Sequence, residues 1–152
     1  TGQYDDNAEI FWASGACMFV RASAFREAGG LDEDFFAHME EIDICWRMKQ
    51  MGYRIMYCGQ STVYHVGGGS LDKSSPKKTY LNIRNNNTML YKNLPESQLY
   101  PVFFSRFFLD MMAAVKFLID GGVRHFGAVV RAAIVRRELT APSSCCPRCL
   151  MK

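Results

Sequence analysis

Glycines recur through the N-terminal half of the chain and limit the length of any helix or strand there. Gly29-Gly30, Gly52 and the run Gly67-Gly68-Gly69 each follow a short segment in which apolar and polar residues are mixed. Glycine adopts a positive φ at little cost, so it commonly ends a helix or allows a tight turn. Short segments of this kind bury their apolar faces only by packing in layers. The pattern therefore favours an α/β layer built from short pieces.

The residues between and beyond these glycines predict particular elements. Residues 10–21 are almost continuously apolar, which is typical of a strand covered on both faces, although the first half could be a turn. Helices are expected at 22–28 and 40–51, each followed by glycine, and a strand at 53–58. Further helices are expected at 77–93, 102–120 and 123–139, with a hinge bracketed by Pro95 and Pro101.

Length, composition and net charge limit the number of domains and the kinds of partner that the chain can have. The 152 residues are 49% hydrophobic and 22% charged, which suits one domain with a core, or one domain with an appendage. The net charge of +3 is too small to indicate nucleic-acid binding, so no nucleic-acid partner is expected. The charge is uneven, because residues 101–152 hold 8 basic and 3 acidic side chains, against 10 and 12 in residues 1–100. A basic C-terminal third indicates an anionic surface or partner.

The compartment is predicted to be cytoplasmic and reducing. No stretch of about 18 uncharged apolar residues is present, and no signal peptide is visible. The chain starts without methionine, close to what looks like the middle of a domain, which suggests a fragment. Its last residues supply three thiols with no nearby histidine, so a frayed tail is favoured over a zinc site. These thiols belong to Cys145, Cys146 and Cys149.

Carboxylates open the helix expected at 40–51. Stabilisation of Glu40 and Glu41 by the helix dipole is a purely structural explanation for them. A glutamate beside aromatic residues also suits general-base catalysis, because partial desolvation raises its pKa toward neutrality. Asp43 is explained more simply as the partner of Arg47, a pair worth a few tenths of a kcal/mol if exposed. The aromatic residues Phe35, Phe36 and Trp46 are assigned to the core.

A histidine before the glycine run is the second candidate. His65 emerges from a short strand into Gly67-Gly68-Gly69, where it could meet a metal or a phosphate. A structural histidine is the commoner outcome for such a position. The spacing fits neither a Walker A loop nor a dinucleotide fingerprint.

Taken together and in this order, these features resemble a known family. The stretches concerned are Trp-Ala-Ser-Gly-Ala-Cys-Met-Phe-Val-Arg (12–21), Gly-Gly-Leu-Asp-Glu-Asp-Phe-Phe (29–36), Glu-Glu-Ile-Asp-Ile-Cys-Trp-Arg (40–47), Gly-Tyr-Arg-Ile (52–55) and His-Val-Gly-Gly-Gly-Ser (65–70). The sequence resembles the C-terminal half of the catalytic domain of family 2 glycosyltransferases, of GT-A fold and rhamnosyltransferase-like kind. The resemblance covers roughly residues 8–93, and Arg84-Asn85-Asn86-Asn87 is similar to the helix motif that follows. It implies an incomplete mixed sheet.

The resemblance implies an inverting sugar transfer. A nucleotide-diphosphate sugar is the donor, and a hydroxyl of a growing cell-surface glycan or lipid-linked acceptor attacks its anomeric carbon while a carboxylate takes the proton. The family's Glu-Asp pair falls on Glu40-Glu41, so Glu41 is the expected base. Glutamate replaces aspartate there, which lengthens the reach by one methylene.

The same resemblance assigns binding residues. His65 matches a histidine that completes a metal site or contacts the diphosphate, and the backbone of Gly67, Gly68 and Ser70 would approach the phosphates. Trp12, Ser14 and Gly15 match the acceptor side, where an aromatic face can stack on a sugar. Core packing is an equally good explanation for Trp12.

A divalent metal, Mn²⁺ or Mg²⁺, is also implied. In the family its main ligands are an Asp-x-Asp motif in the first half of the domain, after an apolar strand. Asp5-Asp6 lacks that spacing and that strand. The chain alone is therefore expected to bind donor weakly and not to turn over.

Three segments are expected. Residues 1–93 would be the C-terminal half of the catalytic domain, residues 94–140 an amphipathic helical extension and residues 141–152 a flexible tail. Residues 102–139 would either lie on an anionic bilayer at the inner membrane face or pack back on the domain as a hairpin. Two rival functions remain, a non-catalytic membrane-attachment or assembly module and, less favoured, a small zinc-binding protein.

Overall fold

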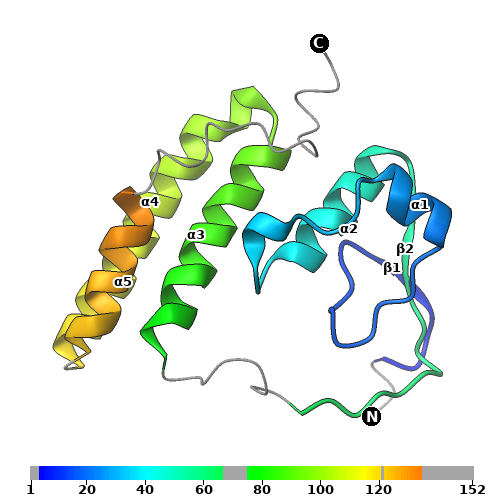
Figure 1. The fold of residues 1–152 in the computed structure, drawn as a ribbon, viewed down its shortest axis with the longest axis horizontal. Helices are drawn as coiled ribbons and strands as arrows, with labels where there is room; N and C mark the ends of the chain where they lie inside the picture. The colour runs from blue at the N-terminus through cyan, green and yellow to red at the C-terminus, as the bar shows by residue number, and fades with distance from the viewer. Residues whose placement is uncertain (1–3, 67–74, 121, 135–152) are drawn as a thin grey trace.

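The computed structural model describes residues 4–66, 75–120 and 122–134 (Figure 1). Within these ranges the fold is α/β and mostly helical. In chain order its elements are β1 (Ala8–Ile10), α1 (Ala22–Glu27), the 3₁₀ helix η1 (Glu33–Phe35), α2 (Glu40–Gln50), β2 (Ile55–Tyr57), α3 (Pro76–Asn93), α4 (Glu96–Ile119) and α5 (Val123–Ile134).

The sheet is smaller than the sequence suggests. β1 and β2 pair antiparallel, with Ala8 opposite Tyr57 and Ile10 opposite Ile55, and no mixed sheet occurs in the described ranges. The strand expected at 10–21 is wrong beyond Ile10. The Cys17 N–H donates to the Ser14 carbonyl in a turn, so this segment curls away and leaves Phe19 96% exposed.

The first hydrophobic core lies between α1 and α2. Ala24 and Ala28 pack against Ile44 and Met48, all of them buried. The glycine stops act as predicted. Gly29 and Gly30, which follow α1, have φ of 81° and 72°, and Gly52, which follows α2, has φ of 87°. Positive φ in this range strains any residue with a Cβ, so glycine is what allows the chain to leave each helix there.

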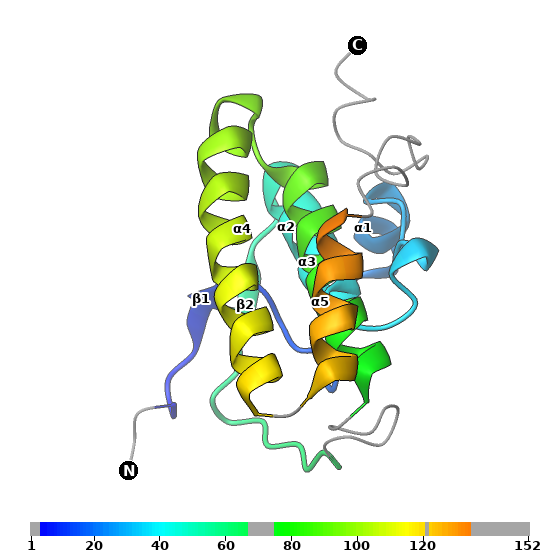
Figure 2. The ribbon, with the colours of Figure 1, turned by 90° about the vertical axis from the view of Figure 1, so that its left-hand side faces the viewer.

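The second core lies in a layer of three helices. Figures 1 and 2 show α3, α4 and α5 with nearly aligned axes, and Figure 1 shows α3 between this pair and α2. The buried residues that join the three helices are Ile83, Ala114, Val129 and Ala132. The expected hairpin of α4 and α5 thus packs back on α3.

The predicted hinge between Pro95 and Pro101 is wrong. Pro95 caps α4, and the helix continues through Pro101. Proline withholds one N–H from the early turns of the helix, but its fixed φ is compatible with helical backbone. In the part of the chain that the structure describes, no helix has both the length and the apolarity to cross a bilayer.

Candidate active site

A cavity of about 810 Å³ lies beside the sheet and α2. The loop after β1, the inner face of α2 and the segment after β2 all contribute to its walls. Trp12, Ser14 and His65 are among the lining residues, so three of the predicted site residues share one cavity. Residues far apart in the sequence meet here because the β1–β2 pairing brings their flanking loops together.

Trp12 provides an aromatic side chain in the wall of this cavity. Phe11 packs edge-to-face on Trp46 of α2, with ring centroids 5.3 Å apart. The neighbouring Trp12 remains 42% exposed. Neither Phe11, which is 45% exposed, nor Trp12 belongs to the core, and the indole of Trp12 keeps an open face on which a sugar ring can stack. Ser14 shapes this loop, since its Oγ accepts the Ala16 N–H at 3.3 Å.

Gly15 brings this loop against Glu41. A Cβ added to Gly15 would lie 3.8 Å from Cβ and 4.0 Å from Cδ of Glu41. One carboxylate oxygen of Glu41, Oε2, is shielded from solvent, and no donor among the described residues reaches it. The same holds for Oε2 of Glu40. Buried polar atoms rarely lack partners, so each oxygen keeps acceptor capacity that no described residue uses. Neither glutamate is among the residues that line the cavity itself.

The start of α2 favours negative charge at these positions. Glu40 and Glu41 lie in the first turn, and Met39 at the N-cap provides no side-chain hydrogen bond. The first N–H groups of the helix therefore present partial positive charge, which stabilises a carboxylate.

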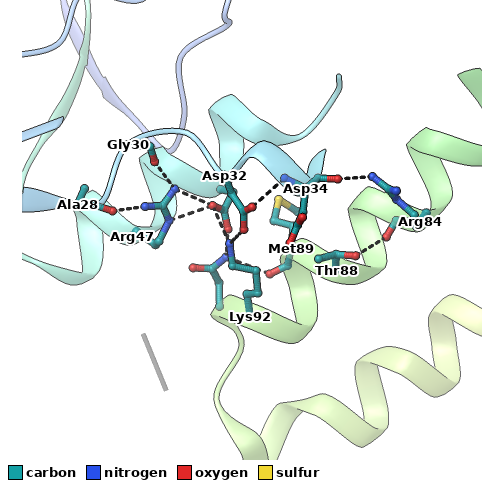
Figure 3. Close-up of polar contacts among 11 residues, drawn as sticks. Ala28, Gly30, Asp32, Asp34, Arg47, Arg84, Thr88, Met89 and Lys92 are labelled. Carbon is teal, nitrogen blue, oxygen red and sulfur yellow. Dashed lines mark hydrogen bonds and ion pairs between the residues drawn. The ribbon is translucent and has the colours of Figure 1, made fainter. Parts of the chain in front are cut away.

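Asp43 has a structural role, as the sequence indicated. It accepts from Nε of Arg47 at 2.9 Å, and both side chains are buried rather than exposed. Arg47 also donates to the carbonyls of Ala28 and Gly30, which Figure 3 shows. The pair is thus a buried link between α2 and the end of α1.

Two residues of α3 complete this buried network. Lys92 Nζ lies 2.5 Å from Asp32 Oδ2 and 3.3 Å from Asp43 Oδ2, and Figure 3 shows it reaching Asp32 across the helix interface. Asn93 donates to Asp43 Oδ1 at 2.7 Å. Burial alone would raise the pKa of Asp32, but hydrogen bonds from Lys92 and the Asp34 N–H, together with nearby positive charge, hold it below its ordinary value.

The three aromatic residues that the sequence assigns to the core differ in burial. Phe35 is buried, as expected, and Lys92 Nζ lies 5.2 Å from the centroid of its ring. Trp46 is half-buried. The assignment of Phe36 to the core is wrong, because its ring is 71% exposed beneath Lys77. The positive φ of Phe36 turns its side chain away from the core.

The sequence did not indicate that Arg84 and Asn85 bind the backbone of the segment before α2. The Asn85 side chain is fully buried and donates to carbonyls of the turn before α2. A signal was available in the sequence, since three consecutive asparagines are poor residues for a helix interior. Such residues persist there when their side chains bond elsewhere.

The metal prediction finds no complete site in these ranges. His65 is exposed, and no group of three histidine, cysteine or acidic residues that could hold a metal occurs among the described residues. Asp32-Glu33-Asp34 has the Asp-x-Asp spacing, but Asp32 is held by Lys92. Gly67, Gly68, Ser70 and the tail cysteines lie outside the described residues.

Comparison with known proteins finds partial similarity to glycosyltransferases. The first similarity is to N-acetylglucosaminyl-diphospho-decaprenol L-rhamnosyltransferase of Mycobacterium tuberculosis, with 41% identity over 56 residues. The relatives of this chain are glycosyltransferases. Rhamnosyltransferase WbbL of Escherichia coli is 37% identical over 54 residues, and the low-salt glycan biosynthesis hexosyltransferase Agl10 of Haloferax volcanii is 33% identical over 76 residues.

These glycosyltransferases match only in part. The aligned segments cover 37%, 36% and 48% of this chain, and 18%, 20% and 24% of the respective relatives. The chain thus spans about a fifth of their length. No family model matches, and no solved structure matches. The resemblance to rhamnosyltransferases and glycosyltransferases predicted from the sequence is confirmed.

Proposed function

We propose that this chain is part of an inverting glycosyltransferase of family 2 and GT-A fold, in which Glu41 is the general base. The observation that carries the proposal is the carboxylate of Glu41, which lies against Gly15 with one shielded oxygen and no donor among the described residues. The loop that contacts it also lines the cavity. Similarity to rhamnosyltransferases supports sugar transfer as the reaction.

The step balances with this one carboxylate. An acceptor hydroxyl oxygen forms a bond to the anomeric carbon as the bond from that carbon to the nucleotide diphosphate breaks. The hydroxyl proton passes to Glu41, and the diphosphate leaves with the bonding electron pair. Attack from the face opposite the leaving group inverts the anomeric centre. Glu40 is the alternative base, because its Oε2 is equally free of donors among the described residues.

Both substrates would bind at the cavity that Trp12, Ser14 and His65 line. Trp12, Ser14 and Gly15 form the acceptor side, where the exposed indole stacks on a sugar. The mycobacterial relative is named for a decaprenol-linked substrate, and we propose a glycan or lipid-linked acceptor here also. His65, together with Gly67, Gly68 and Ser70 beyond the described residues, forms the diphosphate side.

We propose that the whole protein binds a divalent metal, Mn²⁺ or Mg²⁺. A metal supplies charge neutralisation for a leaving diphosphate. The described residues do not fit a complete site, because only His65 faces the cavity with ligand chemistry suited to one. No step above depends on the metal.

Sugar transfer by the full-length protein tests this function. Labelled nucleotide-diphosphate sugars, including rhamnose donors, are incubated with lipid-linked acceptors, and the anomer of the product is determined by NMR. Inversion of the donor's configuration is expected. Retention of configuration would contradict the proposal, and the absence of transfer with every donor would favour the non-catalytic alternative.

A second observation favours contact with a membrane surface. The outer face of α4 is apolar and uncovered by any other described element. Its exposed residues, spaced along one side of the helix, are Phe104, Phe108, Met112, Val115 and Ile119. Asp110 is buried on the inner side beside Arg106, whereas the cation Lys116 is exposed. Aromatic residues beside cations suit peripheral binding to an anionic bilayer at the inner membrane face.

Liposome flotation tests this surface. The protein is expected to float with vesicles of anionic phospholipid, and the double variant Phe104→Ser/Phe108→Ser is expected to lose most of this binding. Phe19→Ser, at an exposed phenylalanine outside α4, is the control and should float like wild type. Equal flotation of all three proteins would exclude α4 as the contact. Flotation without any sugar transfer would favour the alternative, a membrane-attachment or assembly module derived from a GT-A domain.

A further inference from the structure

A strained turn leads into α2 and its two glutamates. Phe36, His38 and Met39 have φ of 60°, 73° and 76°, values that residues with a Cβ rarely adopt. Phe36 is the most unusual, because its ψ is −52° and the Ala37 N–H donates across it to the Phe35 carbonyl at 2.6 Å. Such a three-residue turn is rare and strained. It persists only where surrounding groups hold it.

Asn85 of α3 supplies that support. Its side chain is fully buried, and Nδ2 donates to the carbonyls of Phe35, Ala37 and His38 at 2.9, 2.7 and 2.8 Å. All three acceptors belong to the strained turn. The side-chain oxygen of Asn85 accepts from Nε of Arg84 at 2.8 Å, which fixes the orientation of the amide.

Arg84 extends the same contact. Its Nη2 donates to the carbonyl of Asp34 at 2.5 Å and to that of Phe35 at 3.3 Å, and Figure 3 shows it reaching Asp34 from α3. Two consecutive residues of α3 therefore bind four carbonyls between residues 34 and 38. No other element of the described fold binds this turn so extensively.

We propose that Asn85 is a positioning residue for the carboxylates of Glu40 and Glu41. By holding the turn, it fixes where α2 begins and so how Glu41 lies against Gly15. This inference rests on the proposed function, because positioning affects a rate only where Glu41 accepts a proton. A short amide suits the position, since it offers two N–H groups to carbonyls where an aspartate would bring repelling oxygens.

Hydrogen exchange and kinetics on the full-length protein test the proposal. In Asn85→Ala, the amides of residues 36–43 should exchange at least about tenfold faster than in wild type. The rate constant kcat for transfer should fall about tenfold or more, with the donor KM within about twofold, because a misplaced base affects the transition state and not ground-state binding. Asn86→Ala is the matched control and should leave both readouts unchanged. Among the described residues, the Asn86 side chain makes only a long 3.9 Å contact to the Met39 sulfur.

A suppressor separates positioning from general stability. Phe36→Gly removes an exposed ring and the strain of a positive φ. Added to Asn85→Ala, it should restore kcat to within about threefold of wild type. If Asn85→Ala fails to fold, Arg84→Ala, which keeps Asn85, should show a smaller change in the same direction.

Other outcomes would overturn the inference. Unchanged exchange at residues 36–43 in Asn85→Ala and Arg84→Ala would show that the turn does not need this support. A loss of kcat that follows global stability, without rescue by Phe36→Gly, would show a merely structural role. If wild type transfers no sugar, the proposed function fails by itself, and the assignment of Asn85 as a positioning residue falls with it, whatever the exchange shows.

Discussion

At the scale of single residues, buried charge decides what each carboxylate can do. Asp32 and Asp43 lie near Lys92, and Asp43 also accepts from Arg47. No described residue donates a hydrogen bond to Oε2 of Glu41. A carboxylate engaged by two cations has its oxygens occupied, whereas one without donors keeps an oxygen that can accept a hydrogen bond. The network thus separates structural carboxylates from the proposed base.

Asp32 should make stability depend on pH. Its pKa is lowered in the folded protein despite its burial, because Lys92 and the Asp34 N–H donate to it. The folded state therefore holds this proton less tightly than the unfolded state. The stability that Asp32 contributes is present above the ordinary aspartate pKa of about 3.9 and is lost as pH falls through the folded pKa.

Urea unfolding of wild type and Asp32→Asn across pH checks this expectation. The wild type should be the more stable protein at neutral pH, and the gap should shrink below about pH 4. Asp34→Asn is the control, since its exposed side chain makes no ion pair among the described contacts. A gap that persists unchanged into acid would contradict the account of Asp32.

At the scale of elements, glycine has opposite effects in two helices. Gly52 ends α2 with φ of 87°, and a Cβ there meets nothing within 4 Å. Gly127 lies inside α5, where a Cβ also meets nothing within 4 Å. Space is therefore available at both positions, and only the backbone conformation differs. Alanine is strained by the first conformation and favoured by the second.

Alanine substitutions at these glycines should consequently change stability in opposite directions. Gly52→Ala should lower the free energy of unfolding by about 1 kcal/mol, whereas Gly127→Ala should raise it by about 0.5–1 kcal/mol. Denaturant unfolding of both variants beside wild type measures the difference. The same sign for both would show that backbone conformation is not the deciding factor.

Much of the element pattern could be predicted from the sequence. The helices at 22–28, 40–51 and 77–93 are confirmed within a residue or two, because periodic apolar residues and their glycine or proline boundaries are local signals. The strand at 10–21 could not be distinguished from a loop, since an apolar run does not reveal whether a partner strand exists. The support of the turn by Asn85 depends on contacts across about fifty residues, which no local pattern records.

In the candidate site too, local motifs could be predicted from the sequence, whereas contacts between distant residues could not. The order of the motifs indicates Trp12, Ser14 and His65 as site residues, and the structure places all three at one cavity. The contact of Gly15 with Glu41 adds a link between the loop and α2 that spacing did not predict. The roles of all these residues stay predictions until substrate is bound.

At the scale of the whole molecule, two cores are joined by one polar interface. Ala24, Ala28, Ile44 and Met48 form the first core, and the second joins α3, α4 and α5. Between them, α2 and α3 meet through Asp43 and its partners Lys92 and Asn93. The contact that positions the proposed base and the contact that unites the fold therefore lie on the same helix, α3.

Removing the centre of this interface should uncouple the cores. In Asp43→Ala, two buried cations lose a partner, which should lower the free energy of unfolding by about 3–5 kcal/mol. The two cores should then unfold in separate steps, with different midpoints for tryptophan fluorescence, which reports on Trp12 and Trp46, and for helical circular dichroism. Glu33→Ala, at an exposed residue of η1, is the control. One shared midpoint with little loss of stability would contradict this view of the interface.

The role of Glu41 is the central claim, and one kinetic comparison tests it most directly. Single-turnover sugar transfer is measured for the full-length protein and for Glu41→Gln and Glu40→Gln, since glutamine keeps the shape of the side chain but accepts no proton. A loss of at least about a hundredfold is expected in Glu41→Gln, with donor binding unchanged, and a much smaller loss in Glu40→Gln. Equal rates for wild type and Glu41→Gln would contradict the claim.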